Sequence, residues 1–355
     1  MRTYLALSAA AAVLAAAGAT AYATTPGSTP GSTSVSRPLA GMRILISNDD
    51  SMQAAKASNS DGLGLYELRR AMCAAGADVV VMAPWQVQSG KGTAVTNGGV
   101  LTVQRRTVLP AGYEDDCAQA PSGGAVYGVC LADGPCTGNS PSATPADTVK
   151  LALRAGLKAK AGWNQAPDLV LTGINSGPNV SAQVNDSGTV GAAVAALDQD
   201  VPAIAFSSSG DETNTVFPRV NYRANAEFGA RFVAGLKERG LLTSGFALKV
   251  DYPDVSAGQR AGAPAWTRVG DGQVVWHAYE QTGRDSFGIG LGICEENPGD
   301  PCTETTGNAD STALLREGRI AVAPITADRT YGVPVGARRE LKAIERYVEH
   351  EAPRS

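Results

Sequence analysis

Short apolar runs alternate with helix-forming segments between residues 42 and 207 of this 355-residue chain. The runs have the length of buried strands, and the segments between them have the length and periodicity of helices. The predicted strands are 42–47, 77–83, 169–172 and 203–207, and the predicted helices are 63–75, 145–160 and 188–197. Such alternation predicts an α/β fold in which helices cover both faces of a mostly parallel sheet.

The rest of the chain adds further elements of both kinds. Additional predicted strands are 100–108, 125–131, 245–250 and 319–324, and additional predicted helices are 221–239 and 338–349. The dipeptide Asp271-Gly272 lies between two strand-like runs, 266–270 and 273–279, which is typical of a β-hairpin. We therefore expect a hairpin there that forms an accessory lobe or an oligomerisation arm, after which 319–324 returns to the main sheet.

The first residues have the pattern of a secretory signal. A positive start at Arg2 precedes an apolar stretch, 5–17, and the small-x-small site Ala21-Tyr22-Ala23. A membrane anchor would need about 20 apolar residues. We therefore expect cleavage near Ala23, export to the periplasm or the medium, and no membrane association of the mature protein. The expected organisation is a signal peptide (1–23), a flexible leader (24–40) and one domain (41–355) with a core (41–250), a hairpin or accessory lobe (251–310) and a C-terminal segment (311–355).

Composition excludes several classes of function. Lys and Arg number 30 against 34 Asp and Glu, so the chain has no basic excess for binding a nucleic-acid polymer. Only two histidines occur, which argues against zinc catalysis and a histidine-based triad. We expect His277 to be a surface or interface residue and His350 to be solvated. No GxGxxG follows the first strand, so a dinucleotide-dependent oxidoreductase is poorly supported.

Six cysteines become interpretable once export is expected, because disulfides persist in oxidising compartments. Cys294 and Cys302 bracket a polar loop and are the first expected pair. Three more cysteines lie between 117 and 136, where we expect one or two disulfides. Cys73 lies in a predicted helix, and we interpret it as a small buried apolar residue.

Two adjacent acids, Asp49 and Asp50, end the first predicted strand. Because a chain turns at a strand end, both carboxylates can converge on one ion, although a solvated turn would have the same sequence. Ser89 and Asn175 follow the next two strands and would bring neutral oxygens to the same edge of the sheet. Hard oxygen ligands of this kind suit Mg²⁺, Mn²⁺ or Ca²⁺, so we expect one divalent cation here.

The sequence Ser187-Gly188-Thr189 immediately precedes a helix rich in Ala and Val. A helix N-terminus offers free N–H groups and the positive end of the helix dipole, which together bind phosphate. Ser187 can equally be a plain N-cap, and both interpretations can hold at once. A divalent cation beside a phosphate-binding helix start indicates phosphoryl chemistry.

These motifs together resemble the SurE family of stationary-phase survival nucleotidases. The matching runs occur in the order of the family and are RILISNDD (43–50), 83–90, 144–153, 173–179 and 187–190, followed more loosely by 310–312 and 318–324. The resemblance implies a Rossmann-like core and a metal-dependent phosphatase of nucleoside 5′- and 3′-monophosphates. It also implies a homodimer or homotetramer built with a protruding hairpin and an exchanged C-terminal segment.

Motif positions carry the roles of the family over to this chain. The resemblance implies that the metal ligands are Asp49, Asp50, Ser89 and Asn175. It implies that Asn179, Ser187, Gly188 and Thr189 line the phosphate pocket. One of the paired aspartates would also activate the attacking water, and we assign this role to Asp50 by analogy.

Some positions depart from the pattern of the family. Ser51 replaces the Gly of NDDG, and the following loop, 52–61, is longer. Gln88 stands where an Arg is frequent, and Lys91 lies just beyond. We hypothesise that Lys91 supplies the missing positive charge to the substrate phosphate. The segment 113–142 and the export signal are also atypical.

Two other functions remain open on sequence alone. The same site would serve a broad-specificity acid phosphatase or exopolyphosphatase, because base recognition would depend on loops that differ from the family. A non-catalytic nucleotide-binding relative is the alternative from another class. The presence of all four expected ligand types argues against that alternative.

Overall fold

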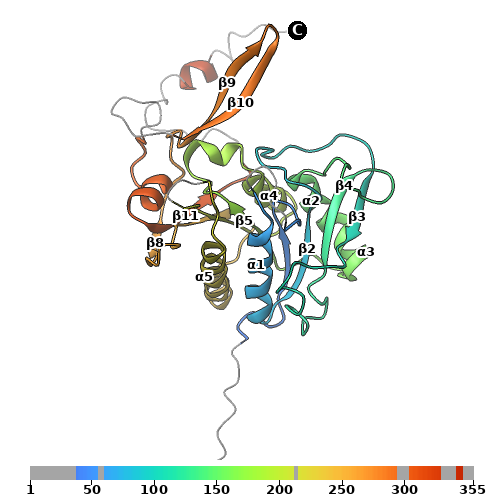
Figure 1. The fold of residues 1–355 in the computed structure, drawn as a ribbon. Coiled ribbons are helices and arrows are strands. Elements are labelled where there is room, and N and C mark those ends of the chain that lie inside the picture. Colours follow the sequence, from blue (N-terminus) through green and yellow to red (C-terminus); the bar gives the residue numbers. More distant parts are fainter. Residues whose placement is uncertain (1–36, 55–59, 212–214, 294–303, 329–340, 347–355) are drawn as a thin grey trace, which may run out of the picture. The chain divides into compact units, whose positions relative to one another are not determined.

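The structure is a computed structural model that describes residues 37–54, 60–211, 215–293, 304–328 and 341–346. The strands of its main sheet are β1 (Arg43–Ser47), β2 (Asp78–Pro84), β3 (Leu101–Arg105), β4 (Val126–Leu131), β5 (Leu169–Ser176), β6 (Ala203–Ser208), β7 (Ala247–Tyr252), β8 (Gly262–Trp266) and β11 (Arg319–Ile325). Their spatial order is β3-β4-β2-β1-β5-β6-β7-β11-β8 (Figure 1). In this spatial order, the six strands from β4 through β2, β1, β5 and β6 to β7 run parallel. At either side, β3 is antiparallel to β4, and β11 is antiparallel to β7.

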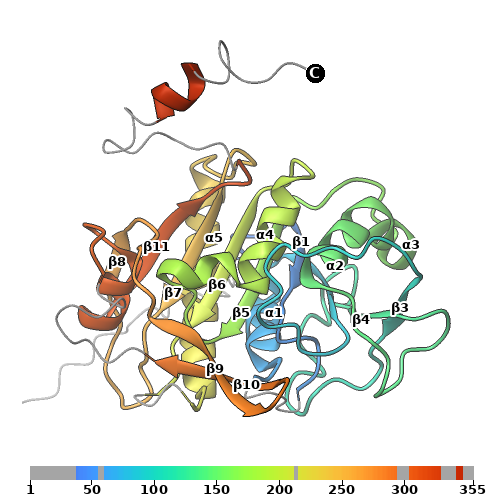
Figure 2. The same cartoon turned by 90° about the horizontal axis from the view of Figure 1, so that it is seen from above.

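Helices cover both faces of this sheet (Figure 2). The helices α1 (Leu63–Ala74) and α5 (Arg219–Glu238) contact each other on one face, and α2 (Pro145–Leu151) and α4 (Gly188–Leu197) do so on the other. Side chains of β1 alternate between them: Ile44 and Ile46 join the core under α1 and α5, and Leu45 joins the core under α2 and α4. The predicted α/β fold is therefore confirmed. The predicted helix 145–160 continues through a π-helical turn, Ala152–Gly156, into α3 (Leu157–Ala161).

The strand order reverses beside β1. From β1 the chain proceeds outward to β2 and β4, and it then returns to β5 on the opposite side of β1 and continues to β6 and β7. Leu45 accordingly lies in register with Val80 on one side and Val170 on the other. Ligands of open α/β sheets bind beyond the carboxyl ends of the strands at such a reversal. The loops after β1 and β5 thus flank the expected binding crevice.

Strand β5 is longer than its sequence predicted. We expected it to end at Thr172 and a loop to begin at Gly173, but pairing with β6 continues to Ser176 after a register shift between Thr172 and Asn175. A Cβ atom at position 173 would lie 2.2 Å from the Phe206 carbonyl oxygen, and φ there is +120°. Only glycine permits this close approach. A Gly that indicates a loop in the sequence instead accommodates an irregular strand.

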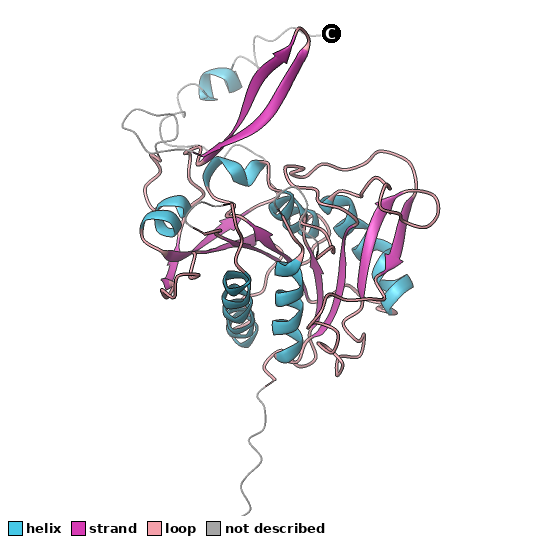
Figure 3. Ribbon diagram, in the orientation of Figure 1, coloured by secondary structure: helices cyan, strands magenta, loops and turns pink. Residues whose placement is uncertain are grey.

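The hairpin prediction was wrong about its turn. The two-stranded hairpin (Figure 3) consists of β9 (Val275–Gly283) and β10 (Ser286–Ile293). Its turn is therefore Arg284-Asp285. The expected turn, Asp271-Gly272, is instead tied to a distant segment: the Asp271 carboxylate accepts hydrogen bonds from the backbone of Thr305 and Thr306. The expected first strand of the hairpin falls partly in β8, which pairs with β11 at the edge of the main sheet.

Two disulfides lie within the described residues. Cys130 pairs with Cys136, as expected for the 117–136 region, but Cys117 pairs with Cys73 across 44 residues, and their Cα atoms lie 5.1 Å apart. The interpretation of Cys73 as a free buried residue was wrong, because burial alone does not distinguish a thiol from a half-cystine. The expected pair of Cys294 and Cys302 lies outside the described residues.

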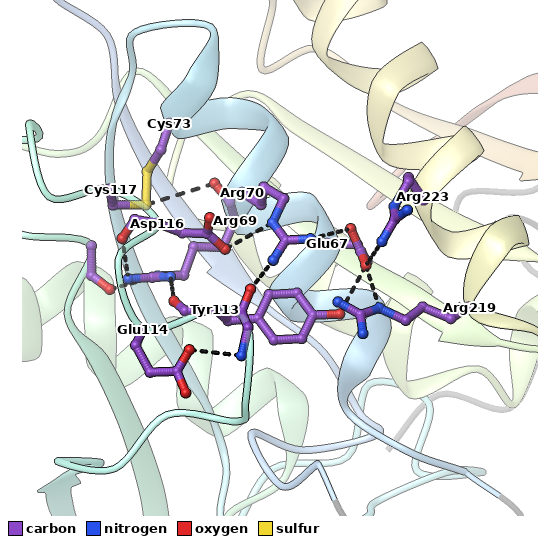
Figure 4. Close-up of polar contacts among 12 residues, drawn as sticks. Glu67, Arg69, Arg70, Cys73, Tyr113, Glu114, Asp116, Cys117, Arg219 and Arg223 are labelled. Carbon is purple, nitrogen blue, oxygen red and sulfur yellow. Dashed lines mark hydrogen bonds and ion pairs between the residues drawn. A yellow bond between two sulfur atoms is a disulfide. The ribbon is translucent and has the colours of Figure 1, made fainter.

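A cluster of charges joins the atypical segment 113–142 to α1 (Figure 4). The Tyr113 ring lies between two guanidinium groups, 4.4 Å from that of Arg70 and 4.6 Å from that of Arg219. Its hydroxyl donates to Glu67 Oε1 at 2.9 Å, and Arg219 Nε donates to the same oxygen at 2.7 Å. Together with the Cys73–Cys117 disulfide, these contacts fasten the segment to the helix that follows β1.

Some expectations fall wholly or partly outside the described residues. The signal peptide 1–23 and most of the leader are among them, and of the predicted helix 338–349 only 341–346 is described, as helix. None of the helices that the structure does describe is long and apolar enough to span a bilayer.

Candidate active site

The acid pair lies where the sheet order reverses. Asp49 and Asp50 follow β1, and both are buried. The Asp49 carbonyl accepts a hydrogen bond from Gln88 N at 2.7 Å, so the loop after β2 is joined directly to the end of β1. Asn48, one residue earlier, donates its side-chain amide to the Ile174 carbonyl of β5 at 3.2 Å. The structure thus brings the three strand-end loops together, as expected from the parallel sheet.

The start of α4 holds the Asp49 carboxylate. Thr189 Oγ1 donates to Asp49 Oδ1 at 2.5 Å. A Cβ atom at Gly188 would lie 2.9 Å from Asp49 Oδ2, so a larger side chain there would displace the carboxylate. The positive end of the helix dipole favours an anion at this place. The predicted phosphate-binding helix start therefore also positions the first acid of the pair.

Asp50 has one oxygen with donors and one without. Its Oδ2 accepts from Ser176 N at 2.7 Å and from Asn48 Nδ2 at 3.3 Å. Its Oδ1 is buried, and no hydrogen-bond partner lies among the described residues. Such an orphaned carboxylate oxygen is costly unless a cation or a water molecule meets it.

Burial raises the pKa of both carboxyl groups of the pair. At Asp49 this effect outweighs the hydrogen bonds from Thr189, which favour the charged form. At Asp50 burial and the negative charge of Asp49 outweigh hydrogen bonds from Ser176 and the Ser60 side chain and raise the pKa to about 8. No Lys or Arg among the described residues forms an ion pair with either acid. The protein part of the site is therefore short of positive charge.

The other two expected ligands differ in their surroundings. Asn175 is buried near the end of β5, next to Ser176, and donates its side-chain amide to the Gly177 carbonyl at 2.8 Å. Ser89 is exposed in a turn that follows Gln88. Lys91 is also exposed and lines an open depression whose lining does not include the aspartates. Asp49, Asp50 and Asn175 are thus buried, whereas Ser89 and Lys91 are exposed on the loop after β2.

Two expected phosphate-binding residues already have partners. Asn179 N donates to Asp251 Oδ1 at 2.7 Å, and Asn179 Nδ2 donates to Ser207 Oγ at 2.8 Å. Ser187 is the N-cap of α4 and accepts a hydrogen bond from Val190 N at 3.1 Å. Both side chains therefore stabilise the loops around the crevice, whatever else they bind.

Sequence reasoning missed a second buried charge cluster behind these loops. Lys249 in β7 is fully buried and forms ion pairs with Asp251 and, at 2.8 Å, with Asp310. Asp310 Oδ1 also accepts from Ser181 N at 3.1 Å, in the stretch that follows Asn179. A signal was available in part, since Lys249 and Asp251 are two residues apart in a strand and so share a face. The contribution of Asp310 comes from a distant segment.

The donor set fits a hard divalent cation. The described residues contain no group of three or more His, Cys, Asp or Glu side chains that could bind a metal. The candidate set is two carboxylates with neutral oxygens from Asn175 and Ser89, a chemistry that suits Mg²⁺, Mn²⁺ or Ca²⁺. The architecture and these side chains place the chain in one class: Rossmann-like α/β proteins with a buried acid pair and a helix N-terminus at the topological switch point.

Comparisons with known proteins identify the family within this class. The model of the family "Survival protein SurE" matches residues 44–275. The 5′-nucleotidase SurE of Desulforamulus reducens is 31% identical over 81% of this chain and 94% of its own length. That of Rubrobacter xylanophilus is 32% identical over 81% and 93%. The crystal structure of the SurE protein from Aquifex aeolicus shares the fold, with a TM-score of 0.55 at 24% identity, over 85% of this chain and 99% of that one. The chain belongs to the SurE family, as its motifs predicted.

Proposed function

We propose that this protein is a divalent-cation-dependent phosphomonoesterase that hydrolyses nucleoside 5′-monophosphates, and also 3′-monophosphates, to nucleoside and phosphate. Family membership assigns the chain to the nucleotidase hydrolases, because relatives that align over nearly their whole length bear the name 5′-nucleotidase. The cation dependence and the 3′ activity go beyond the names of these relatives and are part of the proposal.

The observation that carries the proposal is the unbalanced acid pair. Two adjacent buried carboxyl groups lie at the switch point, and Asp50 Oδ1 has no donor among the described residues. Asp49, Asp50, Ser89 and Asn175 would hold the cation. When bound, the ion would neutralise the pair and polarise the phosphoryl group.

The remaining steps belong to groups of the chain. The start of α4 would bind the phosphate through its free N–H groups, beside Gly188 and Thr189. Asp50 would orient the attacking water through Oδ1, because Ser176 N already holds Oδ2. Asn179 and Ser187 would support this pocket through the hydrogen bonds that fix its loops.

Lys91 would attract the substrate phosphate from the open side of the site. Lys91→Ala is expected to raise KM and to leave cation affinity unchanged, whereas Lys158→Ala, an exposed lysine of α3, serves as the control. Unchanged kinetics in the Lys91 variant would refute this role.

Phosphate release from a substrate panel tests the whole proposal. The panel contains 5′- and 3′-mononucleotides, sugar phosphates and polyphosphate, each with Mg²⁺, Mn²⁺, Ca²⁺ or chelator. Cation-dependent release that favours mononucleotides is the expected result. A preference for polyphosphate would indicate an exopolyphosphatase, and no release from folded protein with any ion would indicate a non-catalytic nucleotide-binding relative.

We also propose assembly and location. Phe287, Ile289 and Leu291 of β10 are 61, 74 and 68% exposed, which supports a homodimer or homotetramer formed through the hairpin. The molar mass in solution, with and without Ile289→Glu, tests this. The signal pattern of residues 1–23 supports export to the periplasm or the medium, and the N-terminal sequence of the protein recovered from each fraction tests it.

A further inference from the structure

A polar depression of about 550 Å³ lies beside the loop that carries Ser89. Residues 86–88 and Lys91 form one side of it, and residues 138–142 form the other. The second side belongs to the segment 113–142, which the motif comparison identified as atypical. The volume of the depression is within the range of small-molecule sites, about 300–1,000 Å³.

The second side of the depression is held firmly in place. The Cys130–Cys136 disulfide joins it to β4, and Cys130 forms a β-bridge with Ser142. Gln86 connects the two sides, because its backbone N–H donates to Ser142 Oγ at 3.1 Å and its side-chain amide donates to the Gly138 carbonyl at 2.7 Å. A surface fixed in this way would lose little conformational freedom on binding a ligand.

The first side is continuous with the acid pair. Gln88 N donates to the Asp49 carbonyl at 2.7 Å, and four residues later Gly92 N donates to the Asp186 carbonyl at 2.9 Å. The loop 88–92 is therefore anchored both at the end of β1 and just before α4. A substrate with its phosphate at the start of α4 would therefore lie next to this loop.

The lining indicates which chemistry the depression recognises. It contains amide, hydroxyl and ammonium groups and no aromatic side chain among the described residues. The Asn139 side chain is exposed and makes no hydrogen bond with a described residue. Amide side chains both donate and accept, which suits neighbouring hydroxyl groups, whereas stacking of a base would need an aromatic face.

We propose that this depression binds the nucleoside part of the substrate through the hydroxyl groups of its pentose, with Asn139 as a specificity-determining residue. The inference rests on the proposed function and adds the side of the site that distinguishes a nucleotide from other phosphate esters.

Asn139→Ala tests this with three substrates: adenosine 5′-monophosphate, ribose 5-phosphate and phenyl phosphate. The variant raises KM about three- to tenfold for the two pentose esters, the effect of one lost hydrogen bond, and leaves kcat and the KM for phenyl phosphate unchanged. The matched control is Asn164→Ala, an exposed asparagine just before β5. Equal changes for all three substrates, or none, would overturn the proposal.

Direct binding separates this inference from the proposed function. Titration calorimetry with adenosine, which needs no hydrolysis, is expected to show three- to tenfold weaker binding to Asn139→Ala than to wild type or Asn164→Ala. The double variant Cys130→Ala, Cys136→Ala, which loosens the same side, should weaken adenosine binding in the same direction. If the wild-type protein releases no phosphate, the proposed function fails. The titration still shows whether the depression binds adenosine. Equal adenosine affinity in all these proteins would refute it.

Discussion

Two pairs of buried aspartates lie near the carboxyl ends of the parallel strands, and among the described residues only one of these pairs shares a buried lysine. Asp251 and Asp310 share Lys249, whereas Asp49 and Asp50 share no lysine or arginine among the described residues. Burial raises the pKa of Asp251, and Lys249 opposes this, so that the value is about 6, against about 8 for Asp50. The two carboxylates in turn outweigh burial and raise the pKa of Lys249.

This difference separates a structural cluster from a site. Lys249 completes its cluster within the chain, and the cluster ties β7 to the loop after β5 through Asn179 and Ser181. The Asp49 and Asp50 pair carries the cost of two buried acids without such compensation. An uncompensated pair of this kind is a candidate for binding a ligand that supplies the missing charge.

Asp50→Asn should have the largest effect on the protein. We expect hydrolysis to fall by about a thousandfold or more, the loss for a cation worth several kcal/mol in the transition state. The cation-free protein should become more stable by about 1–3 kcal/mol, because the substitution removes the repulsion between two adjacent buried acids. Phosphate release and urea unfolding in chelator measure the two effects, with the exposed Asp133→Asn as control. Retained hydrolysis would disprove the assignment.

Lys249→Met should change the stability of the protein in the opposite direction. Loss of this cation leaves Asp251 and Asp310 buried and unpaired, which we expect to destabilise the fold by about 3–5 kcal/mol. Urea unfolding measures it against Lys158→Met on the surface. Addition of Asp310→Asn should recover part of the lost stability. An unchanged free energy of unfolding in Lys249→Met would mean that the cluster contributes nothing to stability.

A divalent cation should stabilise the protein through the Asp49 and Asp50 pair only. At about 100 times its Kd, a cation that binds only the folded protein adds about 2.7 kcal/mol of stability. We therefore expect Mg²⁺ or Mn²⁺ to raise the thermal unfolding midpoint by several degrees in wild type and Glu67→Gln, and not in Asp50→Asn. An equal rise in Asp50→Asn would place the cation elsewhere.

Glu67 offers a smaller test of a compensated acid. Burial would raise its pKa, but hydrogen bonds from Arg219 and Tyr113 and the charges of Arg70 and Arg219 lower it below its ordinary value of 4.5. A lowered carboxyl pKa contributes stability above the ordinary value, and this stability is lost as pH falls through the folded value. We expect Glu67→Gln to cost about 2 kcal/mol at pH 7 and progressively less below about pH 4.5. A difference that is constant from pH 7 to pH 3 would contradict this.

Local patterns predicted the central elements and the place of the acid pair at the end of β1. The strands around β1, the helix α4 with its Ser187 cap, and the acids after β1 depend on residue spacing and on turn chemistry between neighbours. A parallel sheet then brings Asp49, Asp50 and Asn175 to one edge, so their proximity followed from the fold class. The hairpin turn was mistaken because Asp271-Gly272 has ideal local turn chemistry.

Other features depended on segments that meet only in the folded chain. The tie from Asp271 to Thr305, the Cys73–Cys117 disulfide across 44 residues and the Lys249–Asp310 ion pair each join distant parts of the sequence. So does the depression between 86–91 and 138–142. The sequence alone determined which elements form and where the acids lie, because those depend on neighbours a few residues apart. The tertiary structure decided which buried acids pair with a lysine of the chain. An ion pair depends on distance in space and not on separation along the sequence.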